Sequence, residues 1–154
     1  MSSLPIRVLV AEDNPGLAKV LGFKLKSSGM QPTVCYDGQD AWERFQSGDF
    51  EAVVSDQEMP RMTGVELFRK VRSINELVPI FLVTGRQLEL TESKVVDELS
   101  IHRIFAKPFS PNLIVDVLTE TANAYRTKCA ANPLSTGVIG VSESIESSPQ
   151  SVSG

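Results

Sequence analysis

Short apolar runs alternate with amphipathic segments along most of this chain, from Ile6 to about Arg126. Each run is short enough to be a strand, and most are apolar without a break, which is typical of strands buried on both faces. The runs cover residues 6–11, 33–36, 52–55, 79–83 and 101–106. Between and after them, apolar residues recur at helical spacing. Strands that alternate with helices predict βαβ units, and therefore a parallel sheet with helices on both faces.

The predicted helices begin with recognisable capping residues. Asn14 and Ser110 each stand before a proline, which favours a first helical turn, and Thr63 with Glu66 forms a capping-box pattern. The whole pattern predicts five strands and five helices. In the first and last helices, the residues expected to face the core are Leu17, Val20, Leu21, Leu25, Leu113, Ile114, Val117, Leu118 and Thr121.

The length of the chain fits one domain and an appendage. Globular domains mostly contain about 100 to 150 residues, and the alternating pattern occupies residues 5–126 of the 154. From 127 to 154 the sequence turns to Ser, Gly, Asn and Pro with scattered apolar residues, which predicts a disordered tail or a linker. In the alternative interpretation, the apolar residues of this tail dock on this or another molecule; they are Leu134, Val138, Ile139 and Val141.

Composition narrows the class of protein. The net charge of -4 comes with no basic stripe, which argues against a nucleic-acid partner. No apolar run approaches the roughly 20 residues of a membrane span, and residues 1–5 lack the basic and hydrophobic regions of a signal peptide. We therefore expect a cytoplasmic protein without a membrane partner. Cys35 and Cys129 lie far apart in the sequence and show no metal-ligand spacing.

Polar residues follow four of the predicted strands at the point where each strand ends. They are Glu12, Asp13, Asp56, Thr84, Gly85 and Lys107. Because ligands of open parallel sheets bind outside the carboxyl ends of the strands, we expect these residues to form one pocket. Three carboxylates in one crevice repel one another strongly, so a cation should accompany them. Mg²⁺ suits this pocket because it prefers hard oxygen ligands and is typically bound through one or two carboxylates.

Taken together, these motifs resemble the receiver domain of two-component response regulators, of the stand-alone, single-domain type. The residues that carry the resemblance are Glu12-Asp13, Asp56, Met59-Pro60 with Gly64, Thr84-Gly85 and Lys107-Pro108-Phe109. Each motif alone is weak, but four in the right order, each at the end of its own strand, are specific. The resemblance covers about residues 6–126. It implies a flavodoxin-like (βα)5 fold: a doubly wound, parallel, five-stranded sheet with strand order 2-1-3-4-5.

The resemblance also implies a phosphorelay reaction at Asp56. A sensor histidine kinase or a phosphotransfer protein would supply a phosphohistidine, and Asp56 would attack its phosphorus as a carboxylate nucleophile. The resemblance assigns the Mg²⁺ ion to Asp13, Asp56 and the backbone carbonyl of Glu58, with Glu12 acting largely through water. Such a chain would catalyse only its own phosphorylation and dephosphorylation, and would not be an enzyme in any other sense.

The phosphoryl group and the switch that responds to it would depend on further residues of the pocket. By resemblance, Lys107 and Thr84 would bind the phosphoryl oxygens, and Gly85 would leave the space beside Thr84 open. Thr84 would move toward the phosphoryl group while an aromatic residue of the last strand, here Phe105, turns inward. Relatives also have a cis bond between the lysine and proline that correspond to Lys107 and Pro108.

The surface that transmits the signal would comprise the fourth helix, the fifth strand and the fifth helix. In this chain that surface would include Lys94, Glu98, Arg103 and Phe105. It would bind a downstream protein target, and in the family the same surface often forms homodimers.

Two positions at the entrance of the pocket differ from the usual pattern. Glu58 stands two residues after Asp56, and Arg86 stands two residues after Thr84. One hypothesis is that Glu58 and Arg86 form an ion pair across the entrance and slow the loss of the phosphoryl group. The alternative is that they are two independent, solvated charges.

Three other functions share parts of this pattern. A receiver fold can act only as a protein-binding module that is never phosphorylated, although the intact set of Asp56, Thr84 and Lys107 argues against this. A Mg²⁺-dependent phosphatase with an aspartate nucleophile would usually have a second aspartate where this chain has Glu58, and a cap segment. A flavin-binding electron carrier would need backbone amides near the cofactor phosphate, whereas the first loop here is acidic.

Overall fold

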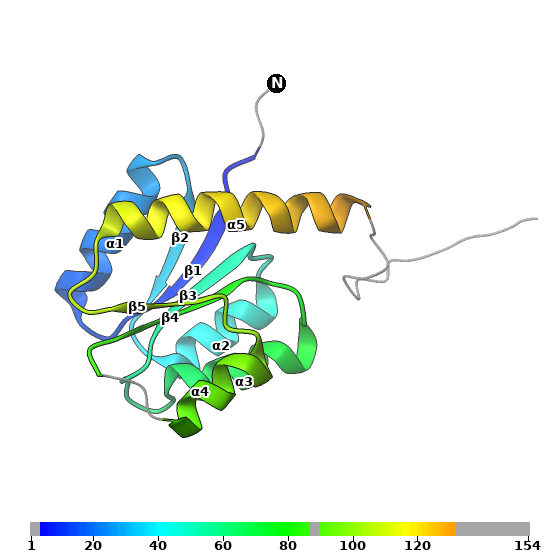
Figure 1. Ribbon diagram of the computed structural model, residues 1–154. Coiled ribbons are helices and arrows are strands. Elements are labelled where there is room, and N and C mark those ends of the chain that lie inside the picture. Colours follow the sequence, from blue (N-terminus) through cyan, green and yellow to red (C-terminus); the bar gives the residue numbers. More distant parts are fainter. Residues whose placement is uncertain (1–3, 87–89, 132–154) are drawn as a thin grey trace, which may run out of the picture.

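A computed structural model of the protein describes residues 4–86 and 90–131. Strands and helices alternate along the chain (Figure 1). They are β1 (Arg7–Ala11), α1 (Pro15–Ser27), β2 (Gln31–Cys35), α2 (Gly38–Ser47), β3 (Ala52–Asp56), α3 (Gly64–Ile74), β4 (Ile80–Thr84), α4 (Leu90–Leu99), β5 (Arg103–Ala106) and α5 (Pro111–Ala131). All strand pairs are parallel and their order is β2-β1-β3-β4-β5, which confirms the predicted flavodoxin-like sheet.

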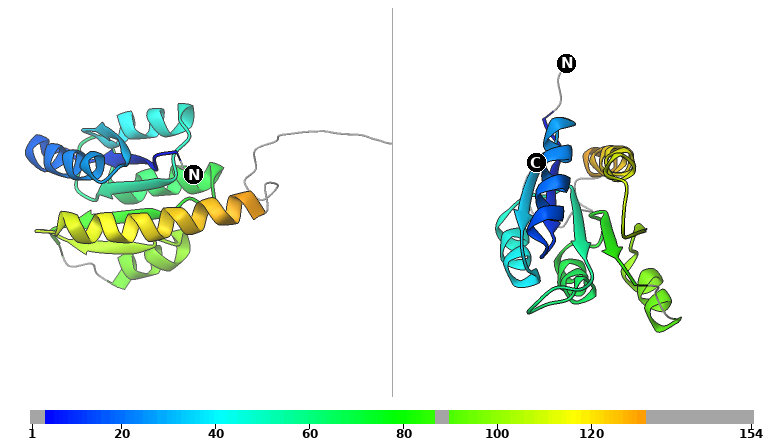
Figure 2. Two further views of the ribbon diagram at one scale, coloured as in Figure 1. Left: turned by 90° about the horizontal axis from the view of Figure 1, so that it is seen from above. Right: turned by 90° about the vertical axis from the view of Figure 1, so that its left-hand side faces the viewer.

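Helices cover both faces of the sheet, as Figure 2 shows from two directions. On one face, Leu21 and Leu25 of α1 and Ile114 and Leu118 of α5 pack with residues of the strands. On the other face, helices α2, α3 and α4 form the second half of the core. Every residue of β3 and β4 is buried, which explains why their sequences are continuously apolar up to the last positions.

Capping residues begin the helices where the sequence predicts them. The Asn14 side chain accepts a hydrogen bond from the backbone N–H of Leu17 at 3.1 Å. At the start of α3 the capping box is complete: Thr63 Oγ1 accepts from the Glu66 N–H at 3.2 Å, and the Glu66 carboxylate accepts from the Thr63 N–H at 2.8 Å. These caps satisfy backbone donors that have no partner inside the helix.

Two residues expected in the core lie at the surface. Val20 is 52% exposed and Leu113 is 41% exposed. In α1 the buried side instead runs through Ala18, Leu21, Gly22 and Leu25, residues at helical spacing that include two small ones. The hydrophobicity of Val20 therefore predicted the wrong edge of the helix, because the strands approach α1 closely where its residues are small.

Helix α5 is longer than the sequence pattern predicts, since it continues to Ala131, past the expected domain boundary at 126. Arg126 attaches this part of the helix to the sheet. Its guanidinium donates to both carboxylate oxygens of Glu51 and, at 2.9 Å, to the backbone carbonyl of Pro5. The expected tail from 132 onward, including its four apolar residues, lies outside the described residues. None of the helices in the described ranges combines the length and apolarity that crossing a bilayer requires.

Candidate functional site

The three acidic residues predicted to share a pocket lie together at the carboxyl end of the sheet. Glu12 and Asp13 follow β1, and Asp56 ends β3, the neighbouring strand. Carboxylate oxygens of all three lie within 4.8 Å of one another. Because β1 and β3 are hydrogen-bonded in parallel, the ends of the two strands are adjacent, and the sheet itself brings the acids together.

Lys107 reaches this acidic cluster from β5, which is separated from β3 by β4. Its Nζ atom lies 3.0 Å from Asp56 Oδ2 and 3.3 Å from Glu12 Oε1. The Lys107–Pro108 bond is cis, as the resemblance implied. One ammonium therefore contacts two of the three carboxylates.

Burial dominates the electrostatics of the cluster. Asp56 is 3% exposed and Glu12 is 4% exposed, while Asp13 is open to solvent. Burial raises the pKa of Asp56 to about 7; the hydrogen bond from Lys107 lowers it and the nearby charge of Glu12 raises it further. Burial lowers the pKa of Lys107, but its contacts with Asp56 and Glu12 outweigh that effect and raise the pKa above its ordinary value. Asp56 is thus harder to ionise than an ordinary aspartate.

The residues of the cluster fit a divalent cation such as Mg²⁺. Among the residues that the structure describes, Asp56 Oδ1 is buried and has no hydrogen-bond partner, and a buried oxygen without a partner normally carries a free-energy penalty. A cation between Asp56 and the exposed carboxylate of Asp13 would satisfy that oxygen. Glu12 is held in place from the other side, because its Oε2 accepts from the backbone N–H of Asn14 at 3.0 Å.

Gly64 explains how the backbone beneath Asp56 is arranged. A Cβ atom at Gly64 would lie 2.5 Å from the carbonyl oxygen of Asp56 and 2.7 Å from a methyl group of Leu82. The first residue of α3 therefore approaches the end of β3 more closely than any side chain would permit. The Ser55 hydroxyl donates to the same Asp56 carbonyl at 2.9 Å. The sequence interpretation did not single out Ser55, although a serine inside an otherwise apolar strand was a usable signal.

Thr84 is the last residue of β4, the strand next to β3, and its hydroxyl is bonded to residues that follow these two strands. Its hydroxyl donates to Glu58 Oε2 at 3.1 Å and accepts from the backbone N–H of Arg86 at 3.1 Å. One hypothesis was an ion pair between Glu58 and Arg86, but the ion pairs within the described ranges do not include one between them. The Glu58 carboxylate accepts from the Thr84 hydroxyl instead. An effect of Glu58 and Arg86 on the loss of the phosphoryl group stays a prediction. Gly85 lies beside Lys107, where a Cβ would meet the lysine Cβ at an ordinary 3.8 Å.

Phe105 was expected at the exposed surface of the fourth helix, fifth strand and fifth helix. It is only 4% exposed and therefore does not contribute to that surface in this structure. Its ring stacks on Phe81 with a centroid distance of 6.1 Å, and the Arg103 guanidinium covers it at 5.4 Å. Of the other residues expected at that surface, Lys94 and Arg103 are exposed, and Glu98 forms a 3.1 Å ion pair with Arg69 of α3.

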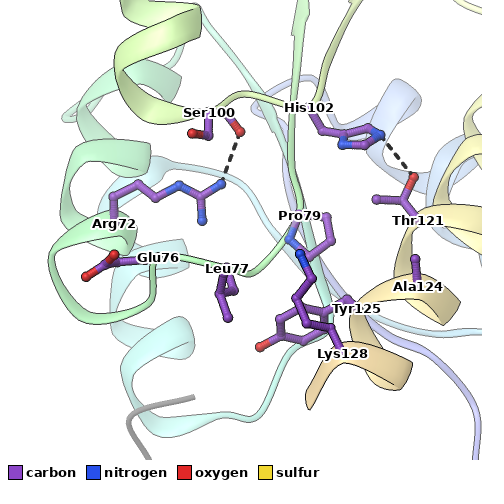
Figure 3. Close-up of a pocket in the computed structure, with 10 residues that line it drawn as sticks. All are labelled: Arg72, Glu76, Leu77, Pro79, Ser100, His102, Thr121, Ala124, Tyr125 and Lys128. Atoms are coloured by element: carbon purple, nitrogen blue, oxygen red, sulfur yellow. Dashed lines mark hydrogen bonds between the residues drawn. The ribbon is translucent and has the colours of Figure 1, made fainter. Parts of the chain in front are cut away.

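A separate cavity of about 330 Å³ lies at the opposite end of the sheet, beside the residues that precede β4 and β5 (Figure 3). Arg72, one of the residues that line it, uses four of its five N–H donors within the protein. The guanidinium donates to the carbonyls of Leu99, Asn75, Val78 and Ser100 at 2.7 to 3.2 Å. Arg72 therefore connects the ends of α3 and α4 through backbone carbonyls.

Comparison with known proteins gives one consistent result for the family. A family model described as the response regulator receiver domain matches residues 8–119. The chain is 33% identical over 109 residues to the sensory transduction protein RegX3 of Mycolicibacterium smegmatis, covering 70% of this chain and 46% of that protein. The chain thus spans about half the length of the curated relatives that it matches at this level.

Two solved structures illustrate the likeness of fold. The receiver domain of a response regulator from Francisella has a TM-score of 0.71 at 23% identity, covering 79% of this chain and 98% of that one. The receiver domain of a sensor histidine kinase from Pseudomonas aeruginosa has a TM-score of 0.69 at 24% identity, covering 77% and 98%. That second structure is described with a magnesium ion coordinated in its active-site cleft.

Proposed function

Because this chain belongs to the response regulator receiver family, it is a domain of phosphorelay signalling, and we propose that Asp56 is the residue that accepts the phosphoryl group. The donor would be the phosphohistidine of a sensor histidine kinase or of a phosphotransfer protein. The chain would act on no other substrate, and would catalyse only the gain and loss of its own phosphoryl group.

One observation carries this proposal: the position of the Lys107 ammonium, 3.0 Å from Asp56 and 3.3 Å from Glu12, beside a buried Asp56 oxygen that has no partner. The oxygen without a partner would hold the cation, and the ammonium lies where negative charge would gather on the phosphoryl oxygens once the other Asp56 oxygen has attacked phosphorus. A merely structural aspartate would have both oxygens satisfied.

The residues of the pocket can perform each part of the transfer. An Asp56 oxygen would form the new bond to phosphorus while the bond from phosphorus to the donor imidazole nitrogen breaks. Lys107 would then exchange its contact with Asp56 for a contact with a phosphoryl oxygen, and the Thr84 hydroxyl would donate to another. Positioning and charge neutralisation of this kind supply most of the catalysis in phosphoryl transfer.

We further propose that the reaction requires Mg²⁺ bound by Asp13, Asp56 and the backbone carbonyl of Glu58, with Glu12 nearby. When bound, the ion would neutralise the acidic cluster and the incoming phosphoryl oxygens. The carboxylates of Glu12, Asp13 and Asp56 outnumber the single ammonium of Lys107, so without a cation the pocket would repel an anionic donor.

Uptake of a phosphoryl group from a small-molecule donor tests the proposal directly. The protein is incubated with phosphoramidate and Mg²⁺, and its intact mass is measured. We expect a single added phosphoryl group, none in the Asp56→Asn protein, and none when EDTA replaces Mg²⁺. Asp116→Asn is the matched control, because Asp116 is an exposed acid on α5 and its replacement should leave the modification unchanged. A modified Asp56→Asn protein would contradict the assignment of Asp56.

The same preparation separates the alternative functions. A receiver fold used only for protein binding would show no added group under any of these conditions. A phosphatase would release many equivalents of phosphate from small phosphate esters, whereas a receiver would release none beyond its own slow turnover.

The output of the domain would be a change in protein contacts. We propose that a downstream protein, or a second copy of this chain, binds the exposed parts of α4, β5 and α5, including Lys94 and Arg103. Phosphorylation adds about 1.5 to 2 units of negative charge, which would shift the balance between two packings of the pocket and of this surface.

A further inference from the structure

The hydroxyl group of Thr84 is bonded to Glu58 and Arg86 in the same structure in which Asp56 is paired with Lys107. It donates to Glu58 Oε2 at 3.1 Å, with Oε1 at 3.4 Å, and it accepts from the Arg86 N–H at 3.1 Å. A hydroxyl group has a single proton to donate. Thr84 therefore cannot donate to Glu58 and to a phosphoryl group on Asp56 at the same time.

The aromatic half of the family's switch is already in its buried arrangement. Phe105 stacks on Phe81 and is covered by Arg103 in the same structure in which Thr84 is bonded to Glu58. Phenylalanine has no hydroxyl group that would hold it at the surface, so burial of its ring is favourable without any signal. This leaves Thr84 as the part of the switch that still has to move.

From this geometry we propose that Glu58 is a positioning residue that competes with the phosphoryl group for the proton of Thr84, and so opposes the activated arrangement. The inference rests on the proposed function of Asp56 and adds the regulation of that site. Its consequence reaches two loops: when Thr84 turns toward Asp56, Glu58 in the β3–α3 loop loses its donor, and the Arg86 N–H after β4 loses its acceptor.

A second explanation of any effect of Glu58 is charge alone, because its carboxylate would repel an anionic group near Asp56. Two substitutions separate the explanations. Glu58→Gln removes the charge but keeps an oxygen that can accept from Thr84. Glu58→Ala removes both. Thr84→Val removes the hydroxyl proton while keeping the shape of the side chain.

The probe is beryllofluoride, an analogue of the phosphoryl group, titrated in the presence of Mg²⁺ against the full chain and its variants. Since a hydrogen bond contributes about 0.5 to 1.5 kcal/mol, we expect Glu58→Ala to bind beryllofluoride about two- to tenfold more tightly than Glu58→Gln. In a Thr84→Val background the two substitutions should give equal affinities, because no proton remains to compete for. Equal affinities of Gln and Ala in both backgrounds, or a difference that persists in the Thr84→Val background, would overturn the proposal.

A measurement without metal or beryllofluoride tests the contact itself. The methyl group of Thr84 and the amide of Arg86 are observed by NMR in the metal-free protein. We expect Glu58→Ala to change the Thr84 side-chain rotamer distribution and the Arg86 amide shift, and Glu58→Gln to change both less. Wild-type protein that takes up no beryllofluoride would contradict both the function of Asp56 and this regulation. Wild-type uptake without coupling between positions 58 and 84 would contradict the regulation alone.

Discussion

The backbone of Gly64 packs so closely against the carbonyl group of Asp56 that a Cβ atom would stand 2.5 Å from the Asp56 oxygen. The start of α3 and the end of β3 are therefore fixed relative to each other by the absence of a side chain. This contact helps to hold the backbone of Asp56, the candidate phosphoacceptor, in place.

We expect Gly64→Ala to displace either α3 or the end of β3, because the Cβ meets backbone and not a flexible side chain. The free energy of unfolding should fall by about 1 to 3 kcal/mol, and uptake of a phosphoryl group from phosphoramidate should slow markedly. Chemical denaturation and intact-mass kinetics measure the two effects. For stability alone, Gly85→Ala is the matched control, since its Cβ would make an ordinary 3.8 Å contact with Lys107. Equal stabilities of the two variants would contradict this account.

Lys107→Met should change both the stability and the titration of the site. The substitution keeps the length of the stem but leaves Asp56 and Glu12 without their shared ammonium. At pH 8 we expect a loss of about 1 to 3 kcal/mol in the free energy of unfolding, and a smaller loss at pH 5, where Asp56 can be protonated. The pKa of Asp56 should rise further, which NMR of its carboxyl carbon can follow. A fall in that pKa would show that Lys107 does not act on Asp56 as the geometry indicates.

The raised pKa of Asp56 should make the free energy of unfolding depend on pH. This pKa is about 7 in the folded protein and 3.8 is its ordinary value, so between these values the folded state holds one more proton than the unfolded state. The free energy of unfolding should therefore fall as pH rises from about 4 to about 7, by at most about 1.4 kcal/mol per pH unit, and level off above. The free energy of unfolding is measured against pH for wild type and for Asp56→Asn, both in EDTA. Subtracting the two curves removes the contributions of the other titratable groups. If the stability of wild type relative to Asp56→Asn increased as pH rises, the pKa of Asp56 would be lowered by folding and not raised, and this prediction would be wrong.

Arg72→Ala should destabilise the protein without affecting the chemistry. The guanidinium donates to four backbone carbonyls at the ends of α3 and α4 and in the segments that follow them, and loss of these bonds should lower the free energy of unfolding by about 2 to 4 kcal/mol. Arg72→Lys should recover only part of this loss, because an ammonium lacks the planar fork. In the folded fraction, phosphoryl uptake at Asp56 should be unchanged; a slower rate there would connect this end of the sheet to the reaction.

The strands buried on both faces were the easiest part of the fold to predict. The runs that became β1, β3 and β4 were located to within about one residue at each end. The edge strands were less certain. β2 begins at Gln31, two residues before the predicted start, because Pro32 is acceptable in an edge strand that lacks one ladder partner. β5 begins at Arg103, since the buried Ile101 packs from a loop and does not belong to the strand.

The acidic cluster and its lysine could be predicted because each residue follows directly from the end of a strand. Contacts that depend on side-chain rotamers could not be predicted from the sequence. The bond between Thr84 and Glu58 replaces the expected pair of Glu58 and Arg86, and neither charge nor spacing distinguishes the two arrangements. The burial of Phe105 likewise depends on how its ring packs against Phe81, which the sequence pattern does not determine.

The ladder of backbone hydrogen bonds between β1 and β3 places Glu12, Asp13 and Asp56 side by side, and the N-cap residue of α1 and the first residue of α3 hold Glu12 and the Asp56 backbone there. The exposed faces of α4 and α5 contribute none of these contacts. If Lys94 and Arg103 contact the partner as proposed, substitutions at these exposed positions would change which partner binds without moving Glu12, Asp13 or Asp56. A receiver of this fold could then be given a new partner while its acidic cluster keeps its geometry.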